Sequence, residues 1–179
     1  SFGIGLLALA LSAPAHAADE PLKIGVILPQ TGVGAVLADQ MKSAYELAVD
    51  HLGGKVGGRN EELVLRDSQG KPDVGKQVAD ELIKSEQVDL VSGVLFSHVM
   101  MAVHGAITRN ETFLVGPVAG PAPLAGERCN NFFFNVSSQN DSPAEVMGHY
   151  LDGEGVKSVY VMAELPGRQG HGHGLQAVV

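Results

Sequence analysis

The sequence is poor in cysteine and in aromatic residues. Its 179 residues include one cysteine and no tryptophan, and aromatic side chains make up 5% of the chain. Cys129 therefore has no partner within the sequence, so it is a free thiol or pairs with a cysteine outside this sequence. A catalytic thiol needs a neighbouring base, and no residue near it in the sequence supplies one. We interpret Cys129 as a core or loop thiol.

Positive charge is also scarce. The chain has 12 lysine and arginine residues against 20 aspartate and glutamate residues, which gives a formal net charge of −8. Proteins that bind nucleic acid neutralise phosphates with clustered lysine and arginine, and the sequence contains no such cluster. We therefore expect no nucleic-acid partner.

The sequence offers no apolar run long enough to cross a bilayer. The run Phe2 to Leu11 is too short for that, and it leads into Ala15-His16-Ala17 and then a polar stretch. This order is typical of a secretory signal with cleavage after Ala17, although the basic segment that normally precedes the apolar run is missing. A buried N-terminal helix is the alternative. We predict that residues 1–17 are a signal peptide, that the protein is exported, and that it is no lipoprotein because no cysteine follows the cleavage site.

Apolar runs typical of buried strands alternate along the chain with segments of helical spacing. Pro72 suits the first turn of a helix, Ser97 is typical of an N-cap, and Ser142 to Glu145 form a capping box. The alternation predicts a doubly wound α/β fold with right-handed crossovers. Strands are expected at residues 22–29, 62–68, 88–93, 112–117, 132–137 and 158–163, and helices at about 41–52, 72–82 and 97–109 and from 142.

Three loops that follow expected strands are candidates for a ligand site, because open α/β sheets bind ligands beyond the carboxyl ends of their strands. They cover residues 29–39, 93–99 and 116–129. In the second loop, the helix start at Ser97 offers a hydroxyl and backbone N–H groups that suit a carboxylate. A cap with no ligand is the open alternative. His98 and His104 lack metal-ligand spacing, and we interpret both as surface or groove residues.

Two enzyme interpretations fail on spacing. Gly32-Val33-Gly34 begins like a dinucleotide-binding loop, but Leu37 stands in place of the third glycine and Asp67 lies too far along the chain to contact a ribose. Ser97-His98 cannot form a nucleophile and base pair, because adjacent residues on a helix do not face one another. We therefore expect no enzyme, no cofactor and no metal.

Several motifs occur together in an order that resembles a known family. They are "KIGVILPQTGVGAVLADQMKSAYELAVDHLGG", "LVLRDSQGKPDVGKQVADELI", "VDLVSGVLFSHV" and "VGPVAGPAPLAGERCNNFFFNVSSQNDSPAEVMGHYL". The chain resembles the periplasmic substrate-binding proteins of ABC importers, in the group that binds branched-chain amino acids (Leu/Ile/Val), amides or aromatic acids. The resemblance implies the type I periplasmic-binding-protein fold, in which two Rossmann-like lobes close on a small molecule and deliver it to a membrane permease.

By position in that family, the first lobe would contact its ligand through a small set of residues. The resemblance implies Leu37, Ser97, Val118, Ala119 and Gly120. Amino-acid binders commonly carry threonine at the position of Gly120 and often an aromatic residue at that of Leu37, so this sequence departs at both. The lost hydroxyl disfavours Leu/Ile/Val binding and leaves room for aromatic or other organic acids. The segments "GPAPLAGERC" and "QND" resemble the aromatic-acid branch most.

The tail "ELPGRQGHGHGLQAVV" does not continue the family pattern, which would lead us to expect a loop resembling "NYQAGKD". Codons can be chosen for residues 164–177 that encode N-Y-Q-A-G-K-D-M-V-T-G-F-K when shifted by one base. We therefore predict that residues 164–179 are a frameshift product or a sequencing artefact, and that His171 and His173 bind no metal. Residues 18–137 are expected to form the first lobe and residues 138–163 the start of the second.

The predicted function is that of an extracytoplasmic solute-binding component of an ABC transporter, located in the periplasm, with a small-molecule ligand and an inner-membrane permease as partners. As a fragment with one lobe, the chain is expected not to bind ligand well alone. A ligand-sensing module of the same fold that regulates a partner is the alternative.

Overall fold

The computed structural model describes residues 20–164 and 175–178, the strands from Val161 onward by their backbone alone. The predicted signal peptide and the histidines of the tail lie outside these residues. The chain divides into two compact units, with the first ending at Ser138 and the second beginning at Gln139. Each unit is described by itself.

The first unit is built on one six-stranded sheet with the strand order β2-β3-β1-β4-β5-β6. All neighbouring strands are parallel except β2 and β3, which are antiparallel. Because β1 has β3 on one side and β4 on the other, the chain reverses its winding direction between β1 and β4. The strands are β1 (Leu22–Leu28), β2 (Lys55–Val56), β3 (Arg59–Asp67), β4 (Leu90–Gly93), β5 (Phe113–Gly116) and β6 (Phe133–Asn135).

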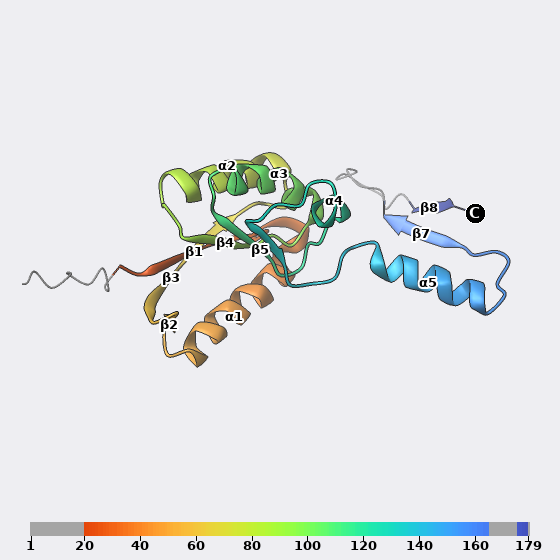
Figure 1. The fold of residues 1–179 in the computed structure, drawn as a ribbon, viewed down its shortest axis with the longest axis horizontal. Helices are drawn as coiled ribbons and strands as arrows, with labels where there is room; N and C mark the ends of the chain where they lie inside the picture. The colour runs from red at the N-terminus through yellow and green to blue at the C-terminus, as the bar shows by residue number, and fades with distance from the viewer. Residues whose placement is uncertain (1–19, 165–174, 179) are drawn as a thin grey trace, which may run out of the picture. The chain divides into compact units, whose positions relative to one another are not determined.

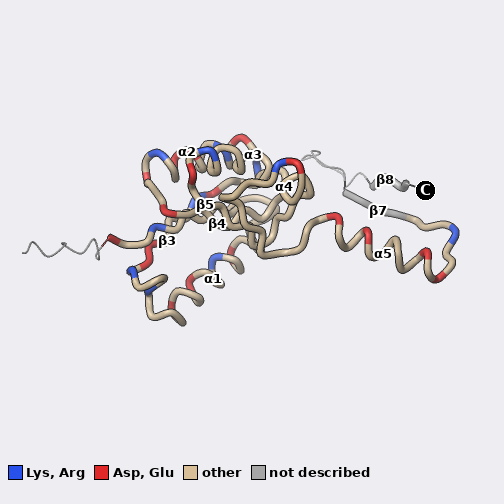
Figure 2. Tube along the Cα trace, viewed as in Figure 1, with Lys and Arg blue, Asp and Glu red and all other residues tan. Residues whose placement is uncertain are grey.

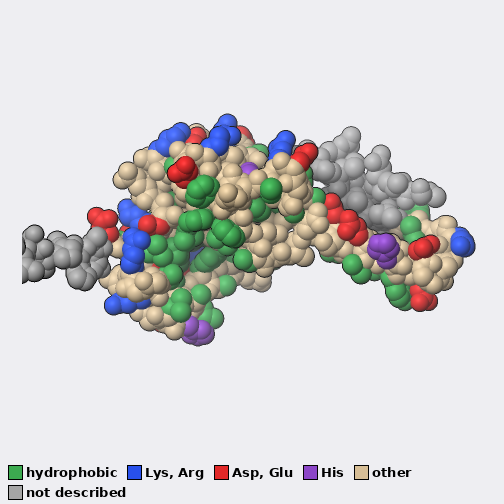
Figure 3. All heavy atoms as spheres, in the orientation of Figure 1, with side chains coloured by type: hydrophobic (Ala, Val, Ile, Leu, Met, Phe, Trp, Pro, Cys, Tyr) green, Lys and Arg blue, Asp and Glu red, His purple; other side chains and the backbone are tan. Residues whose placement is uncertain are grey.

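Helices cover both faces of this sheet, as the sequence predicts for a doubly wound fold (Figure 1). Helix α1 (Ala35–His51) lies on one face, and α2 (Pro72–Lys84) and α3 (Ser97–Thr108) lie on the other. The larger core forms under α2 and α3, where Ile27, Leu82 and Met100 are fully buried. The face under α1 is covered more thinly, and hydrophobic side chains reach the surface between α1 and α2 (Figure 3).

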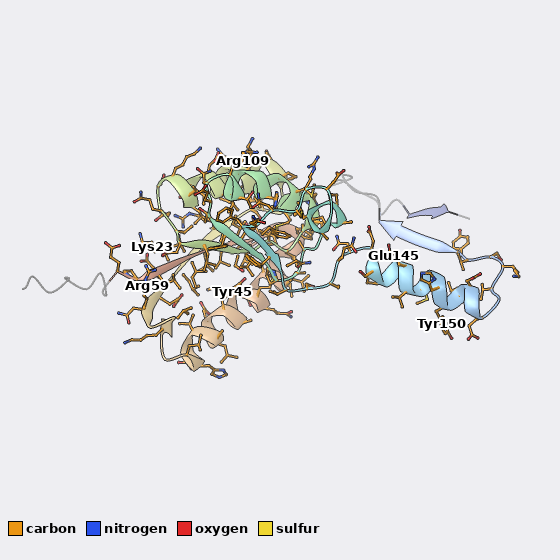
Figure 4. All side chains as sticks on the ribbon, in the orientation of Figure 1. Lys23, Tyr45, Arg59, Arg109, Glu145 and Tyr150 are labelled. Atoms are coloured by element: carbon orange, nitrogen blue, oxygen red, sulfur yellow. The ribbon has the colours of Figure 1, made fainter. Side chains whose placement is uncertain are left out.

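Helix α1 is fixed to the sheet by a polar contact as well as by apolar packing. Tyr45 projects from α1 toward the sheet (Figure 4), and its hydroxyl donates to Ser92 Oγ at 2.7 Å, because the Ser92 hydroxyl itself donates to the Val115 carbonyl at 3.1 Å. Burial raises the pKa of Tyr45, and its hydrogen bonds with the Ser92 side chain and the Gly93 backbone act in the opposite direction. The chain of bonds connects α1, β4 and β5 within one face of the sheet.

The predicted strands and helices of the first unit are confirmed, with α1 beginning at Ala35 rather than near residue 41, but three short elements were missed. Strand β2 forms a hairpin with β3 through Gly57 and Gly58, whose φ angles of 60° and 84° suit a tight turn of the kind that needs glycine. The sequence predicts no strand between the helix expected at about 41–52 and the strand expected at 62–68. A 3-10 turn η1 (Gly32–Gly34) precedes α1, and a single turn of helix α4 (Ala122–Ala125) follows the β5 loop.

Two predicted helix caps are wrong by one residue. Helix α3 begins at Ser97 itself, and Phe96 holds the N-cap position with an extended backbone (φ −100°, ψ 133°). Helix α5 (Ser142–Gly153) likewise begins at Ser142, with Asp141 before it, so the serine is the first helical residue rather than the cap. The predicted proline in the first turn of α2 is confirmed. Serine is common both at the N-cap and in the first turn of a helix, so residue type alone does not distinguish the two positions.

The second unit contains α5 and the antiparallel strands β7 (Val161–Glu164) and β8 (Leu175–Val178). The strand expected at residues 158–163 begins at Val161. No residue of α5 is buried, and Val146, Met147 and Tyr150 are exposed. None of the helices in the described part of the chain has the length and apolar character that crossing a bilayer requires.

Candidate functional site

Three adjacent strands of the first unit end at the edge of the sheet where the sequence places its candidate ligand site. Strands β1, β4 and β5 are neighbours and parallel, so the loops that follow them lie at one edge. Leu37 follows β1 at the start of α1, Ser97 follows β4, and the Val118 to Gly120 loop follows β5. The sheet therefore brings the five predicted site residues to the same edge, beside the reversal between β1 and β4.

At this edge the ends of β1 and β4 approach very closely. Gly93 has a φ of 97°, and a Cβ atom added there would lie 2.5 Å from the carbonyl oxygen of Ile27. The next residue, Val94, donates its N–H to the same oxygen at 2.6 Å and has a φ of 54°, although it is buried. A positive φ is strained for a β-branched residue and costs on the order of 1–3 kcal/mol. This backbone turns the chain from β4 toward the start of α3.

Phe96 connects three of the loops, and it is not among the predicted site residues. A Cβ added at Gly34 would lie 3.0 Å from the Phe96 ring, and one at Gly70 would lie 3.1 Å from it, so both glycines leave room for this ring. The ring stacks on His98 with centroids 5.5 Å apart. His98 Nε2 lies 2.9 Å from the Gly70 carbonyl oxygen, which joins α3 to the loop after β3. His98 therefore positions this edge, in addition to lying at the surface as predicted.

The N-terminus of α3 presents backbone donors at the same edge. The first intrahelical bond runs from the Met100 N–H to the Phe96 carbonyl at 2.9 Å, so the N–H groups of Ser97, His98 and Val99 precede the regular helical ladder. Ser97 is half-buried. The positive end of the helix dipole and these donors together favour a negatively charged group.

The Val118 to Gly120 loop can offer a ligand mainly its backbone and the side chain of Val118. Val118 is 41% exposed, whereas the Ala119 side chain belongs to the core and is 2% exposed. A Cβ at Gly120 would lie 2.4 Å from the Ser138 carbonyl oxygen and 2.5 Å from Asn135 Nδ2. A threonine in this position therefore does not fit without movement of its neighbours. The loop can contact a ligand through Val118 and through its backbone.

Exposed apolar side chains gather at the start of α1. Leu37 is 50% exposed, and Val33 and Val36, which the sequence analysis did not select, are 88% and 73% exposed. Helix starts usually carry polar residues, so the run "GVGAVLA" was the signal that could have identified them. Beside them, Gln30, Ala38 and Lys42 help to line a hollow of about 180 Å³. That is smaller than the 300–1,000 Å³ typical of small-molecule pockets.

Asp67 holds the loop after β1 against the end of β3. Its carboxylate accepts hydrogen bonds from the Gln30 N–H at 2.8 Å, the Thr31 hydroxyl at 2.7 Å and the Gln69 N–H at 2.7 Å. Burial raises the pKa of Asp67, but the hydrogen bonds from Thr31, Gln69 and Gln30 outweigh it, and the pKa lies below its usual value.

Replacement of Asp67 by asparagine is expected to lower the free energy of unfolding at neutral pH by about 1–2 kcal/mol, because charged acceptors form the stronger hydrogen bonds. The pKa of Asp67 is lower in the folded state, so its contribution is present above the unfolded pKa of about 4 and is lost as pH falls through the folded value. Urea unfolding at neutral and acid pH measures both effects. The difference in the free energy of unfolding between wild type and variant is expected to be smaller at acid pH.

Asp39→Asn is the matched control, since the described residues give this exposed aspartate no hydrogen-bond partner. An equal loss of stability in the two variants at neutral pH would contradict the role assigned to Asp67.

The described residues also show where the possible metal ligands and the single cysteine lie. Within residues 20–164 and 175–178, no group of three histidine, cysteine, aspartate or glutamate side chains is placed to hold a metal ion. Cys129 is an exposed free thiol in the loop between α4 and β6, so it is a loop thiol rather than a core one.

The sequence pattern of the periplasmic binding protein family matches residues 21–172. The chain belongs to this family. Leu/Ile/Val-binding protein homolog 3 of Brucella melitensis is 30% identical over 139 residues, which are 76% of this chain and 37% of the relative. The chain therefore spans less than two-fifths of the length of this relative.

Solved structures agree with this assignment. A solute-binding protein of an ABC transporter from R. palustris, in complex with benzoate, is 29% identical to this chain, with a TM-score of 0.72. The matched region covers 77% of this chain and 38% of the R. palustris chain. A solute-binding protein from Rhodopseudomonas palustris BisB5, in complex with 3,4-dihydroxybenzoic acid, is 26% identical to this chain, with a TM-score of 0.70. This match covers 76% of this chain and 37% of the BisB5 chain. The type I fold expected from the sequence is confirmed for the matched part, with the antiparallel strand β2 added to the parallel sheet.

Proposed function

We propose that the protein is the extracytoplasmic solute-binding component of an ABC importer, which captures a small organic acid or amino acid and delivers it to a membrane permease. The family assignment supports this proposal, and so do relatives whose names state Leu/Ile/Val binding or whose structures hold benzoates. The relatives compared are transport proteins, so the proposal includes no catalytic role. It also disfavours the alternative of a sensor that regulates a partner.

The observation that carries the proposal is the combination of groups at the carboxyl edge of β1, β4 and β5. The N-terminus of α3 at Ser97 offers donors to a carboxylate, and Leu37 and Val118 are exposed apolar side chains beside the same edge. The backbone of Ala119 and Gly120 completes this wall. The arrangement suits a molecule with a negative head and an apolar body.

The same wall favours an aromatic or other organic acid over a branched-chain amino acid. Gly120 has no hydroxyl, and its close neighbours Ser138 and Asn135 leave no room for a threonine side chain. A hydrogen bond from a hydroxyl to a charged head group would contribute about 1.5–3 kcal/mol. A ligand that needs this bond is therefore bound less well than one held by its carboxylate alone.

The location and the boundaries of the chain are part of the proposal. Residues 1–17 would direct export and be removed after Ala17, which places the mature protein in the periplasm beside its permease. Residues 164–179 would come from a shifted reading frame. The genomic DNA around the codon for Ala163 tests the second point, since it contains or lacks the shifted coding sequence.

Ser97→Ala tests the site in a chain whose reading frame is restored and extended to the length of its relatives. The variant is expected to weaken binding of an acidic ligand such as benzoate by about 1–2 kcal/mol, through loss of a hydrogen bond to a charged group. Calorimetry measures the affinity, and Ser43→Ala, at an exposed position of α1, is the matched control. Unchanged affinity in Ser97→Ala would remove this residue from the site.

A further inference from the structure

A groove of about 380 Å³ lies on the helical face of the first unit, away from the carboxyl edge. It is lined by α3, by Lys76 of α2, and by the segment after α4 that contains Arg128 and Asn130. Arg109, which ends α3, lies 12 residues beyond Ser97, so about 18 Å of helix separates it from the proposed ligand site. The groove is therefore distinct from the proposed ligand site at the carboxyl edge.

The groove is rich in positive charge that nearby acids leave largely uncompensated. Figure 2 shows lysine and arginine along α2 and α3 and beside α4, and Arg109 is labelled in Figure 4. Among the described residues no aspartate or glutamate lines the groove, and none forms an ion pair with Lys76 or Arg109. Arg128 has only its exposed chain neighbour Glu127, at 3.9 Å. Such a contact between exposed charges contributes little.

The positive charge of the groove changes the pKa of a buried histidine in its wall. His104 is 9% exposed and packs edge-on against Phe133, with centroids 5.4 Å apart, and its Nε2 has no hydrogen-bond partner among the described residues. Burial lowers the pKa of His104, and Arg128 and Arg109 lower it further. Two guanidinium groups therefore act on one buried imidazole whose Nε2 has no hydrogen-bond partner among the described residues. Buried polar atoms rarely stay unpartnered in native proteins.

We propose that this groove binds a compact tetrahedral oxyanion such as phosphate. Arg109 and Arg128 are the fork-shaped donors that phosphate recognition favours, and Lys76 of α2 and the Asn130 amide, which also line the groove, can add further donors. A dianion would offset the charge that the two guanidinium groups bring together. This second site is independent of the organic-acid site and would let the protein respond to an inorganic anion while carrying another ligand.

Phosphate binding to the chain tests the proposal at constant ionic strength, measured by calorimetry and by broadening of the ³¹P resonance. Saturable one-to-one binding is expected, with acetate weaker by about tenfold or more because it has one charge and two oxygens. Arg109→Gln and Arg128→Gln are each expected to weaken phosphate binding by about tenfold, the effect of one charge-assisted hydrogen bond. Both arginines are exposed, so the variants are expected to keep the fold.

Lys55→Gln is the charge-matched control, because it removes one positive charge from an exposed residue of strand β2, which does not line the groove. Affinity within twofold of wild type is expected for this variant. The proposal is overturned by absence of saturable phosphate binding, by equal weakening in Lys55→Gln and the arginine variants, or by acetate binding as tightly as phosphate.

Discussion

Replacing Gly93 with alanine is expected to lower the free energy of unfolding by about 3–4 kcal/mol, through backbone strain and overpacking. Gly93 has a φ of 97°, and its added Cβ would lie 2.5 Å from the Ile27 carbonyl oxygen and 3.0 Å from the Ile27 nitrogen. Both contacts are to backbone, which cannot rotate away as a side chain can. Urea unfolding followed by circular dichroism measures the loss.

Gly53→Ala separates the two causes. Gly53 also has a positive φ, of 66°, but a Cβ there would meet nothing within 4 Å. Only the strain of the left-handed backbone remains, and the expected loss is about 1 kcal/mol. Equal losses in the two variants would mean that contact with the Ile27 backbone adds nothing to the loss in Gly93→Ala. The account of how this edge is built would then be wrong.

The second large effect concerns ligand binding by the 179-residue chain. A good pocket buries about 70–90% of a small ligand, whereas the described edge offers one wall and a hollow of about 180 Å³. We therefore expect no thermal shift when benzoate is added to this chain. A frame-restored chain extended to the length of its relatives is expected to gain about 2.7 kcal/mol at a ligand concentration a hundred times the dissociation constant.

The two chains are compared at equal protein concentration, with the same acids, by differential scanning fluorimetry. Equal stabilisation of both would show that the first unit is sufficient to bind ligand. The expectation from the family resemblance, that two lobes close on the ligand, would then fail.

Most of the fold could be predicted because its elements repeat a strong pattern. The apolar run at β1 and the helical spacing of α2 and α3 place the sheet and the layer that covers it. The elements that were missed are short. Strand β2 has two residues and α4 has four, so neither contains enough residues to show a period. The predicted N-cap residues were wrong for a different reason, since serine is common both at the N-cap and in the first turn of a helix.

The site was predictable at the level of loops and less so at the level of side chains. The rule that ligands bind beyond the ends of parallel strands selects the loops containing Leu37, Ser97 and Val118. It does not show that Ala119 faces the core or that Phe96 packs against Gly34 and Gly70, because these facts depend on contacts between segments distant in the sequence. The groove at Arg109 and Arg128 was missed for the same reason, since 19 positions separate the two arginines.

The most direct test of the central claim is a crystal structure of the extended, frame-restored protein with a bound acid such as benzoate. The account predicts that the carboxylate lies within hydrogen-bonding distance of the α3 N-terminus at Ser97, with the ring beside Leu37 and Val118. A ligand found elsewhere, for example in the groove between α3 and Arg128, with the carboxyl edge of β1, β4 and β5 left untouched, would contradict it.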